Sequence, residues 1–156
     1  MKNLLKYILA LVLGISAAET FSQAYTWEPL GTATVNGTNG NVYAITSYNG
    51  KIIFGGQFTV AGTVPANNIA SYDPATGVWS ALGSGTNGEI HALTVRGAEL
   101  IAGGLFTQAG GTAASNIARW NGTAWQSLGS GTNAEVNALT LFGGDLIAGG
   151  EFGNAG

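Results

Sequence analysis

The feature that most constrains the fold of this chain is an internal repeat with a period of 46 to 48 residues. Each copy contains a Trp-x-x-Leu-Gly segment, a Gly-Thr-Asn triplet, an apolar run, a two-residue turn and a Gly-Gly-x-Phe ending. Trp27, Trp79 and Trp125 open the three copies. A repeat of this kind folds into one supersecondary unit per copy, and neighbouring units bury the core between them.

Each copy predicts a four-stranded antiparallel meander. The first strands read VYAITSY, IHALTVR and VNALTLF, the second strands end in the Gly-Gly doublets, and NNIASY and SNIARW supply third strands. Asn49-Gly50 and Gly143-Gly144 offer the positive φ angles that type I′ turns require, and we expect the same of Asn121-Gly122. Asp73-Pro74 starts a longer turn.

The large aromatic side chains indicate how the sheets pack. One twisted sheet of this size cannot bury tryptophan and phenylalanine at every repeat, so these residues need the face of the next sheet. The small column Ala44, Ala92 and Ala138 and the Gly-Gly doublets let neighbouring backbones approach closely. We therefore predict an all-β fold, a partial β-propeller of about two and a half four-stranded antiparallel blades over residues 25–156.

The motifs also resemble known repeats. Gly55-Gly56 followed by YDPATGVW resembles a kelch repeat of the galactose oxidase central domain. The fuller pattern, from GGxF through NIARWNGTAW to LIAGG, is similar to the propellers of cortical cell-polarity marker proteins of fungi. It also resembles exported bacterial surface proteins that carry a type IX sorting domain. The resemblance implies a propeller fold. Function has to be argued from particular residues, since propellers host many unrelated activities.

The N-terminus predicts a secretory signal peptide over residues 1–24. Lys2 and Lys6 precede an apolar run, Tyr7–Ala18, and small residues precede a cut before Tyr25. A cut before Glu19 is the second choice. Twelve apolar residues form a helix of about 18 Å, too short for a hydrocarbon core of about 30 Å. We expect a secreted or cell-surface protein with no membrane span after signal removal.

Composition excludes several classes of function. The part after residue 24 carries seven acidic and three basic residues, a net charge of −4. Three scattered bases cannot neutralise a nucleic-acid backbone, so we expect no nucleic-acid partner. The chain has no cysteine. Disulfides, thiolate metal sites and a cysteine nucleophile are therefore excluded, as is a copper site of the galactose oxidase kind, which needs a cysteine-crosslinked tyrosine and two histidines.

Two polar motifs could carry chemistry but have simpler interpretations. GSGTNG, residues 83–88, matches the G-x-G-x-x-G pattern, but a strand follows it where a dinucleotide site needs a helix. His91 is the one histidine, and its column holds Tyr43 and Asn137 in the other copies. We expect a polar residue near the propeller axis or at a strand end, because no partner acid or nucleophile is implied.

The acidic columns are interpreted as solvated turns. Glu89 and Glu135 occupy one equivalent position of the repeat, and Glu99 and Asp145 occupy another. Calcium at GTNGE or GTNAE is a weak alternative, with one carboxylate per loop. The repeated tryptophans could stack on sugars, but packing between blades is the favoured interpretation. We therefore predict that Trp79 and Trp125 are buried between sheets. Two glycosylation sequons, Asn36-Gly37-Thr38 and Asn121-Gly122-Thr123, matter only in a eukaryotic secretory route.

These observations favour a non-enzymatic, exported interaction or adhesion scaffold without cofactor, catalytic or metal-binding residues. Its partner would be a protein or a surface glycan. One alternative is a carbohydrate-binding propeller, with sugar-platform candidates Trp27, Trp79 and Trp125. Another is an enzyme fragment whose active residues lie in missing blades. The third copy stops after Phe152, so we expect the chain to be a fragment of a longer protein, or two or three copies to form one ring.

Overall fold

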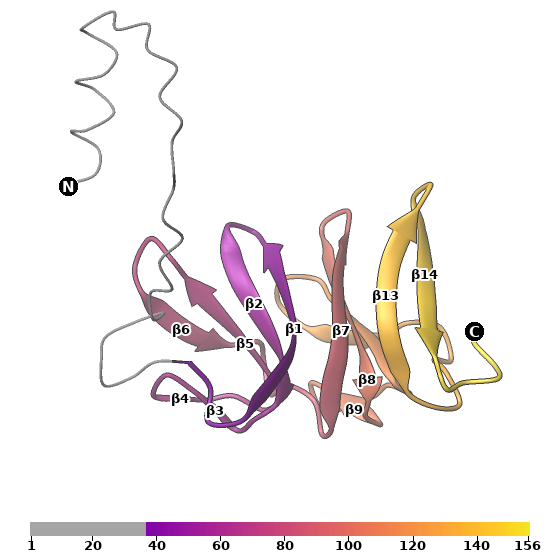
Figure 1. Ribbon diagram of the computed structural model, residues 1–156, viewed down its shortest axis with the longest axis horizontal. Coiled ribbons are helices and arrows are strands. Elements are labelled where there is room, and N and C mark those ends of the chain that lie inside the picture. Colours follow the sequence, from indigo (N-terminus) through magenta and orange to yellow (C-terminus); the bar gives the residue numbers. More distant parts are fainter. Residues whose placement is uncertain (1–36) are drawn as a thin grey trace, which may run out of the picture.

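The computed structural model describes residues 37–156 of the chain (Figure 1). The predicted signal peptide and Trp27 lie outside the described residues. Every regular element in the described part is a β-strand, and no helix there is long and apolar enough to cross a membrane. The expected all-β class is confirmed.

The first blade is a four-stranded antiparallel meander. Its strands are β1 (Asn41–Tyr48), β2 (Lys51–Gln57), β5 (Ile69–Asp73) and β6 (Val78–Ala81), paired in the order β1-β2-β5-β6. Trp79 lies in β6, so the repeated tryptophan closes a blade in the structure although it opens a unit in the sequence. The connection from this tryptophan to the next Gly-Thr-Asn triplet leads into the second blade.

The second blade repeats this architecture, and the third is present in part. The second contains β7 (Glu89–Arg96), β8 (Glu99–Leu105), β11 (Ile117–Trp120) and β12 (Trp125–Ser127). The third contains β13 (Val136–Phe142) and β14 (Asp145–Gly150) within residues 37–156. The expected two and a half blades are confirmed.

A short hairpin that was not predicted from the sequence interrupts each complete blade. β3 (Val60–Ala61) pairs with β4 (Val64–Pro65), and β9 (Gln108–Ala109) pairs with β10 (Thr112–Ala113). These hairpins fill the long segment between the second and third strands of each blade. Strands of two residues are too short to show an alternating pattern, so they could not be recognised from the sequence.

The turns agree with expectation in most positions. Asn49 and Gly50 both have positive φ, as do Gly143 and Gly144. Asn121-Gly122 differs, because only Gly122 has a positive φ angle. There the Asn121 side-chain oxygen accepts hydrogen bonds from the backbone amides of Thr123 and Ala124, so a side-chain-stabilised turn replaces the expected type I′ turn.

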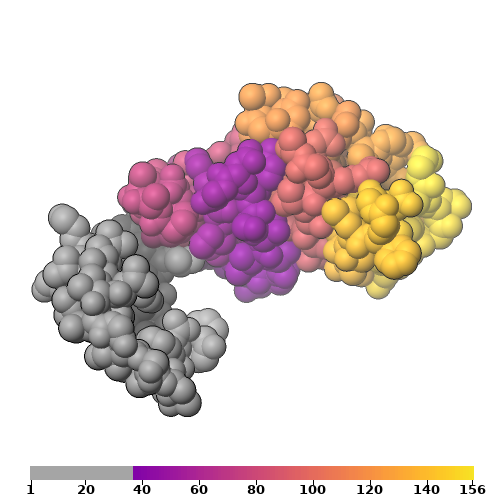
Figure 2. Space-filling view, turned by 90° about the horizontal axis from the view of Figure 1, so that it is seen from above, coloured from indigo at the N-terminus to yellow at the C-terminus, as the bar shows by residue number. Residues whose placement is uncertain are grey.

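The first strands of successive blades lie side by side. β1 contacts β7, and β7 contacts β13, so these strands form the inner, axis-facing side of the arc (Figures 1 and 2). Each interface between blades is apolar. Ile53 and Ile69 of the first blade share a core with Ile90 of the second, and Ile101 and Ile117 of the second share one with Val136 of the third.

Candidate functional site on the inner strands

Each inner strand carries a β-bulge at the same point of the repeat. The pairing register shifts between Val42 and Ala44, between Ile90 and Ala92, and between Val136 and Ala138. The residues left out of register are Tyr43, His91 and Asn137. A bulge redirects a side chain and is often found beside functional sites. We call these three residues the inner ladder.

The second glycine of each Gly-Gly doublet makes room for the bulge. A Cβ atom at Gly56 would collide with the carbonyl oxygen of Asn41, and one at Gly104 with that of Glu89. Gly150 stands in the same relation to Glu135. The expectation that these doublets allow close approach of backbones is confirmed for this glycine. Their position opposite the bulge explains why the repeat keeps glycine there.

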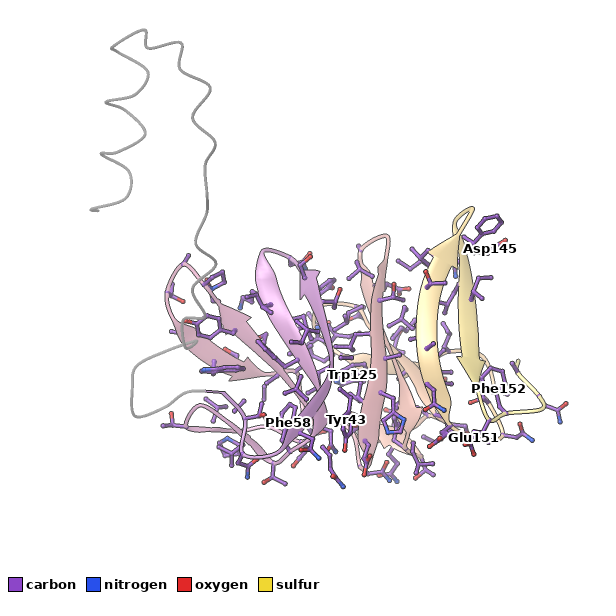
Figure 3. The ribbon with its side chains drawn as sticks, viewed as in Figure 1. Tyr43, Phe58, Trp125, Asp145, Glu151 and Phe152 are labelled. Carbon is purple, nitrogen blue, oxygen red and sulfur yellow. The ribbon has the colours of Figure 1, made fainter. Side chains whose placement is uncertain are left out.

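The inner ladder is joined across the blades by side-chain contacts. The Tyr43 ring meets the His91 ring edge to face, with 5.5 Å between the centroids. His91 Nδ1 lies 2.9 Å from Asn137 Oδ1. Tyr43 is 45% exposed, and the side chain of His91 is 20% exposed. Figure 3 shows Tyr43 on β1, beside the neighbouring inner strand. The ladder is therefore a continuous row of aromatic and polar side chains that runs across the three inner strands.

Two carboxylates flank this ladder. Glu89 Oε2 lies 3.2 Å from His91 Nε2, and Glu135 Oε2 lies 4.0 Å from His91 Nδ1. The Asn137 amide nitrogen donates to Glu135 Oε1 at 3.1 Å, which directs the amide oxygen of Asn137 toward His91. The two acids were interpreted as parts of solvated turns. The structure instead gathers them around His91: Glu89 lies two residues before it on β7, and Glu135 approaches from the segment that precedes β13.

The ring nitrogens of His91 both face oxygen acceptors. These acceptors are the Glu89 carboxylate and the Asn137 amide oxygen. Both hydrogen bonds form only when both nitrogens carry hydrogen. Within residues 37–156, no group of three or more His, Asp or Glu side chains has an arrangement that could hold a metal ion. His91 lies on the inner strand β7, near the axis, which is one of the two positions expected for it.

The Gly-Thr-Asn triplets connect each inner strand to the short hairpin of its own blade. The Asn87 side-chain oxygen accepts hydrogen bonds from the amides of Thr107 and Gln108, at 3.0 and 2.9 Å. Asn39 and Asn133 make the matching pairs of bonds in the other blades. These asparagine oxygens, weighed as calcium ligands in the sequence, serve as backbone acceptors.

The same triplets also link one blade to the next. The Asn68 amide nitrogen donates to the Thr86 carbonyl oxygen at 2.9 Å, and Asn116 donates likewise to Thr132. Thr86 and Thr132 are buried. Asn68 and Asn116 adopt positive φ angles, which asparagine tolerates better than most residues. GSGTNG is therefore a connection between strands that clamps two blades, in agreement with the favoured interpretation.

The predicted burial of Trp79 and Trp125 is confirmed. Their side chains are 7% and 4% exposed. Trp125 Nε1 donates to the Leu82 carbonyl oxygen at 2.8 Å, across the junction between two blades. Trp79 packs on Phe54 and Tyr72, and its Nε1 has no hydrogen-bond partner within residues 37–156. Neither buried ring offers a free face on which a sugar could stack.

The second acidic column lies at the tips of the β7–β8 and β13–β14 hairpins. Glu99 Oε1 accepts a hydrogen bond from Arg119 Nη1 at 3.1 Å, and both side chains are about one third exposed. Asp145 lies at the hairpin tip of the third blade (Figure 3). An exposed ion pair of this kind contributes little, about 0–1 kcal/mol, to stability.

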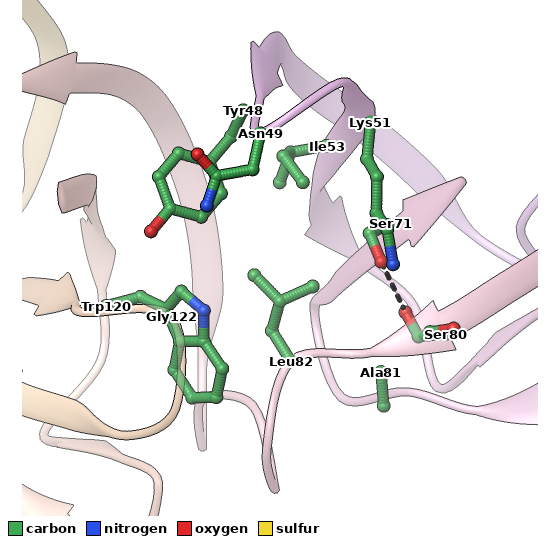
Figure 4. A pocket seen from close by; sticks show the side chains of 10 residues that line it. All are labelled: Tyr48, Asn49, Lys51, Ile53, Ser71, Ser80, Ala81, Leu82, Trp120 and Gly122. Atoms are coloured by element: carbon green, nitrogen blue, oxygen red, sulfur yellow. Dashed lines mark hydrogen bonds between the residues drawn. The ribbon is translucent and has the colours of Figure 1, made fainter. Parts of the chain in front are cut away.

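A pocket of about 200 Å³ lies between the first two blades, beside the β1–β2 turn (Figure 4). Tyr48 and Trp120 form aromatic walls, while Asn49, Lys51 and Ser71 supply polar groups. The Ser71 hydroxyl donates to the Ser80 carbonyl oxygen at 3.4 Å. This pocket could not be predicted from the sequence, because its walls come from two different copies of the repeat.

The meander blades, their apolar junctions and their bulged inner strands define a β-propeller repeat protein. Residues 22–141 match the family model of the Rax2 C-terminal beta propeller domain, and the chain belongs to this family. The match agrees with the resemblance to propellers of cortical cell-polarity proteins and with a role as an interaction scaffold. A search of curated proteins returned no match to this chain.

Proposed function

We propose that this protein is an exported, non-enzymatic scaffold that binds a partner at the cell surface through its inner ladder. The observation that carries the proposal is the different use of two sets of polar residues. The asparagines and threonines that recur in every copy hold the blades together. The ladder position instead changes from Tyr43 to His91 to Asn137, and these side chains lie on an accessible inner face.

Charge suggests the chemistry of the partner. Glu89 and Glu135 place two carboxylates beside the ladder, and the Tyr43 hydroxyl and Asn41 amide add hydrogen-bonding groups. A basic, hydroxyl-rich or amide-rich segment of a protein or surface glycan would complement this surface. Both ring nitrogens of His91 face oxygen acceptors, which supports a role in holding this surface together.

The test is a ladder variant with Tyr43→Ala, His91→Ala and Asn137→Ala. We expect it to unfold at nearly the same denaturant concentration as the parent chain, because partly exposed side chains contribute little to stability. Its binding to cells of the producing organism should fall at least tenfold. Labelled protein and flow cytometry would measure this binding, with Val78→Ala on β6 as a matched control away from the ladder. Unchanged binding by the folded ladder variant would reject the proposal.

Glycan binding is the second candidate function, and the pocket between the first two blades is the observation that favours it. Its aromatic walls and polar groups lie between two blades, where a small sugar could be held. A glycan array can distinguish binding at the pocket from binding at the inner ladder. The array is probed with the parent chain and with a double variant that carries Asn49→Ala and Lys51→Ala. Sugar binding lost in that variant and kept in the ladder variant would favour the pocket.

A further inference from the structure

The pocket between the first two blades contains a single kind of charge. Lys51 is the one charged residue among the described residues that line it, and Asn49 and Ser71 also line it. Figure 4 shows the Lys51 ammonium beside Ser71, with Trp120 on the opposite side of the pocket. No acidic side chain of residues 37–156 lines the pocket. Its lining therefore presents a positive charge that is not balanced from within.

An ion pair occupies the equivalent place in the second blade. Glu99 stands there in the position of Lys51. Arg119 stands in the position of Ser71, because these two residues have the same register against the second strand of their blades. Arg119 Nη1 donates to Glu99 Oε1 at 3.1 Å. Two long side chains thus balance each other's charge in the second blade, whereas in the first blade Lys51 lies beside a short neutral serine.

Lys51 has no acidic partner within residues 37–156. The ion pairs in this part of the chain centre on His91 and Arg119. Asp73 lies near the same end of the sheet, but its carboxylate accepts a hydrogen bond from the backbone amide of Ala75 at 2.9 Å. The position of a counter-charge beside Lys51 is therefore open to a ligand.

The neutral groups and the size of the pocket define the rest of that ligand. Ser71 is 5% exposed, and its contact with the Ser80 carbonyl oxygen, at 3.4 Å, is long for a hydroxyl donor. The side-chain amide of Asn49 adds both donors and an acceptor. A volume of about 200 Å³ is below the roughly 300–1,000 Å³ of pockets for drug-sized ligands. These features suit one small unit that carries hydroxyl groups and a negative charge.

We propose that this pocket binds an acidic sugar unit, a uronate, with the sugar carboxylate at Lys51 and sugar hydroxyl groups at Ser71 and Asn49. The inference rests on the glycan binding proposed above for this pocket and adds the class of sugar. Lysine acts on a carboxylate as a compact point charge, and salt screens a partly buried pair less than an exposed one. A neutral sugar binds more weakly, because it leaves the charge of Lys51 unbalanced.

The test titrates sodium glucuronate, and glucose as its neutral match, into the isotope-labelled chain. The amide NMR signals of Gly50 and Lys51 report on the pocket. The Kd for glucuronate should be lower than that for glucose by about tenfold, the value of one charge-assisted contact. Lys51→Met should raise the glucuronate Kd to near that of glucose, and Lys51→Arg should keep the preference for glucuronate because it keeps the charge. Lys51→Glu with Ser71→Arg installs the ion pair of the second blade and should abolish glucuronate binding.

The possible failures of this test are distinguishable. Circular dichroism and urea unfolding establish that each variant is folded, and Lys51→Met keeps the test decisive if the double variant does not fold. Equal Kd values for glucose and glucuronate at the pocket overturn the acidic-sugar inference and leave glycan binding standing. Absence of signal shifts with both sugars overturns glycan binding at the pocket as well. Acetate that binds as tightly as glucuronate overturns the sugar assignment, as does glucuronate binding that Lys51→Met leaves unchanged.

Discussion

At the residue scale, the Gly-Gly doublet combines two requirements in two adjacent positions. The second glycine lets the bulged inner strand approach, and the first receives a side chain from the next blade. Because strand residues alternate between faces, one position contacts its own sheet neighbour and the other contacts the following sheet. The doublet therefore encodes both the bulge and the blade junction, which explains its recurrence in all three copies.

Gly55→Ala and Gly149→Ala form a matched pair that tests this assignment. The first adds a methyl group against Ile90, and we expect it to lower the free energy of unfolding by about 1–3 kcal/mol, as overpacking does. The second adds the same group to an open surface and should change stability by about 0.5 kcal/mol or less. Urea unfolding followed by tryptophan fluorescence measures both. Equal effects of the two substitutions would contradict the distinction.

Trp125 offers a second residue-scale prediction. Trp125→Phe keeps an aromatic ring but removes the donor to the buried Leu82 carbonyl oxygen, at a cost of about 1–3 kcal/mol. Trp125→Ala should cost about 3–5 kcal/mol because it also leaves a cavity. The midpoints of urea denaturation should fall in the order parent, Phe, Ala. A Phe variant as stable as the parent would show that this hydrogen bond does not matter.

At the element scale, the Gly-Thr-Asn loops organise structure that the strand pattern does not specify. The β9–β10 hairpin contains two residues per strand, and such a hairpin is at best marginal by itself. Asn87 holds its first strand through two backbone amides, and the isolated bridge between Thr86 and Ala109 adds a third connection. A side chain outside the hairpin thus supports it.

Asn87→Ala should loosen this hairpin locally. The loss of an acceptor for two amides is expected to cost about 1–3 kcal/mol, and hydrogen exchange at Thr107 and Gln108 should accelerate. Asn87→Asp is the control, since its carboxylate retains the acceptor oxygen and should preserve most of the protection. Unchanged exchange in the alanine variant would show that the hairpin is held in another way.

The sequence allowed prediction of most of the strands and missed the local features of the site. The repeat fixed the long strands, the blade number and the Asn49-Gly50 turn, because each of these recurs with a clear pattern. The bulges at Tyr43, His91 and Asn137 were missed, since a single extra residue only blurs the alternation in a short strand. The contact of Glu135 with His91 depends on how two blades meet, which no local pattern records.

At the scale of the whole molecule, the sequence predicts removal of the N-terminal segment on export. The charged residues, the apolar run and the small residues before Tyr25 have the order of a signal peptide. Intact-mass measurement of secreted protein should give Tyr25 as the first residue, or Glu19 as the second choice. Detection of Met1 in soluble exported protein would reject this prediction.

The central structural claim is that successive copies of the repeat pack face to face as propeller blades. Its most direct measurement is a double-mutant cycle between Gly103 and Val136, which meet only across the junction of the second and third blades. Urea unfolding gives the free energies for Gly103→Ala, Val136→Ala and the double variant. Truncation of Val136 makes room for the added methyl group, so the double variant should lose less stability than the two single losses combined, by about 0.5–3 kcal/mol. Additivity within about 0.5 kcal/mol would contradict the blade packing described here.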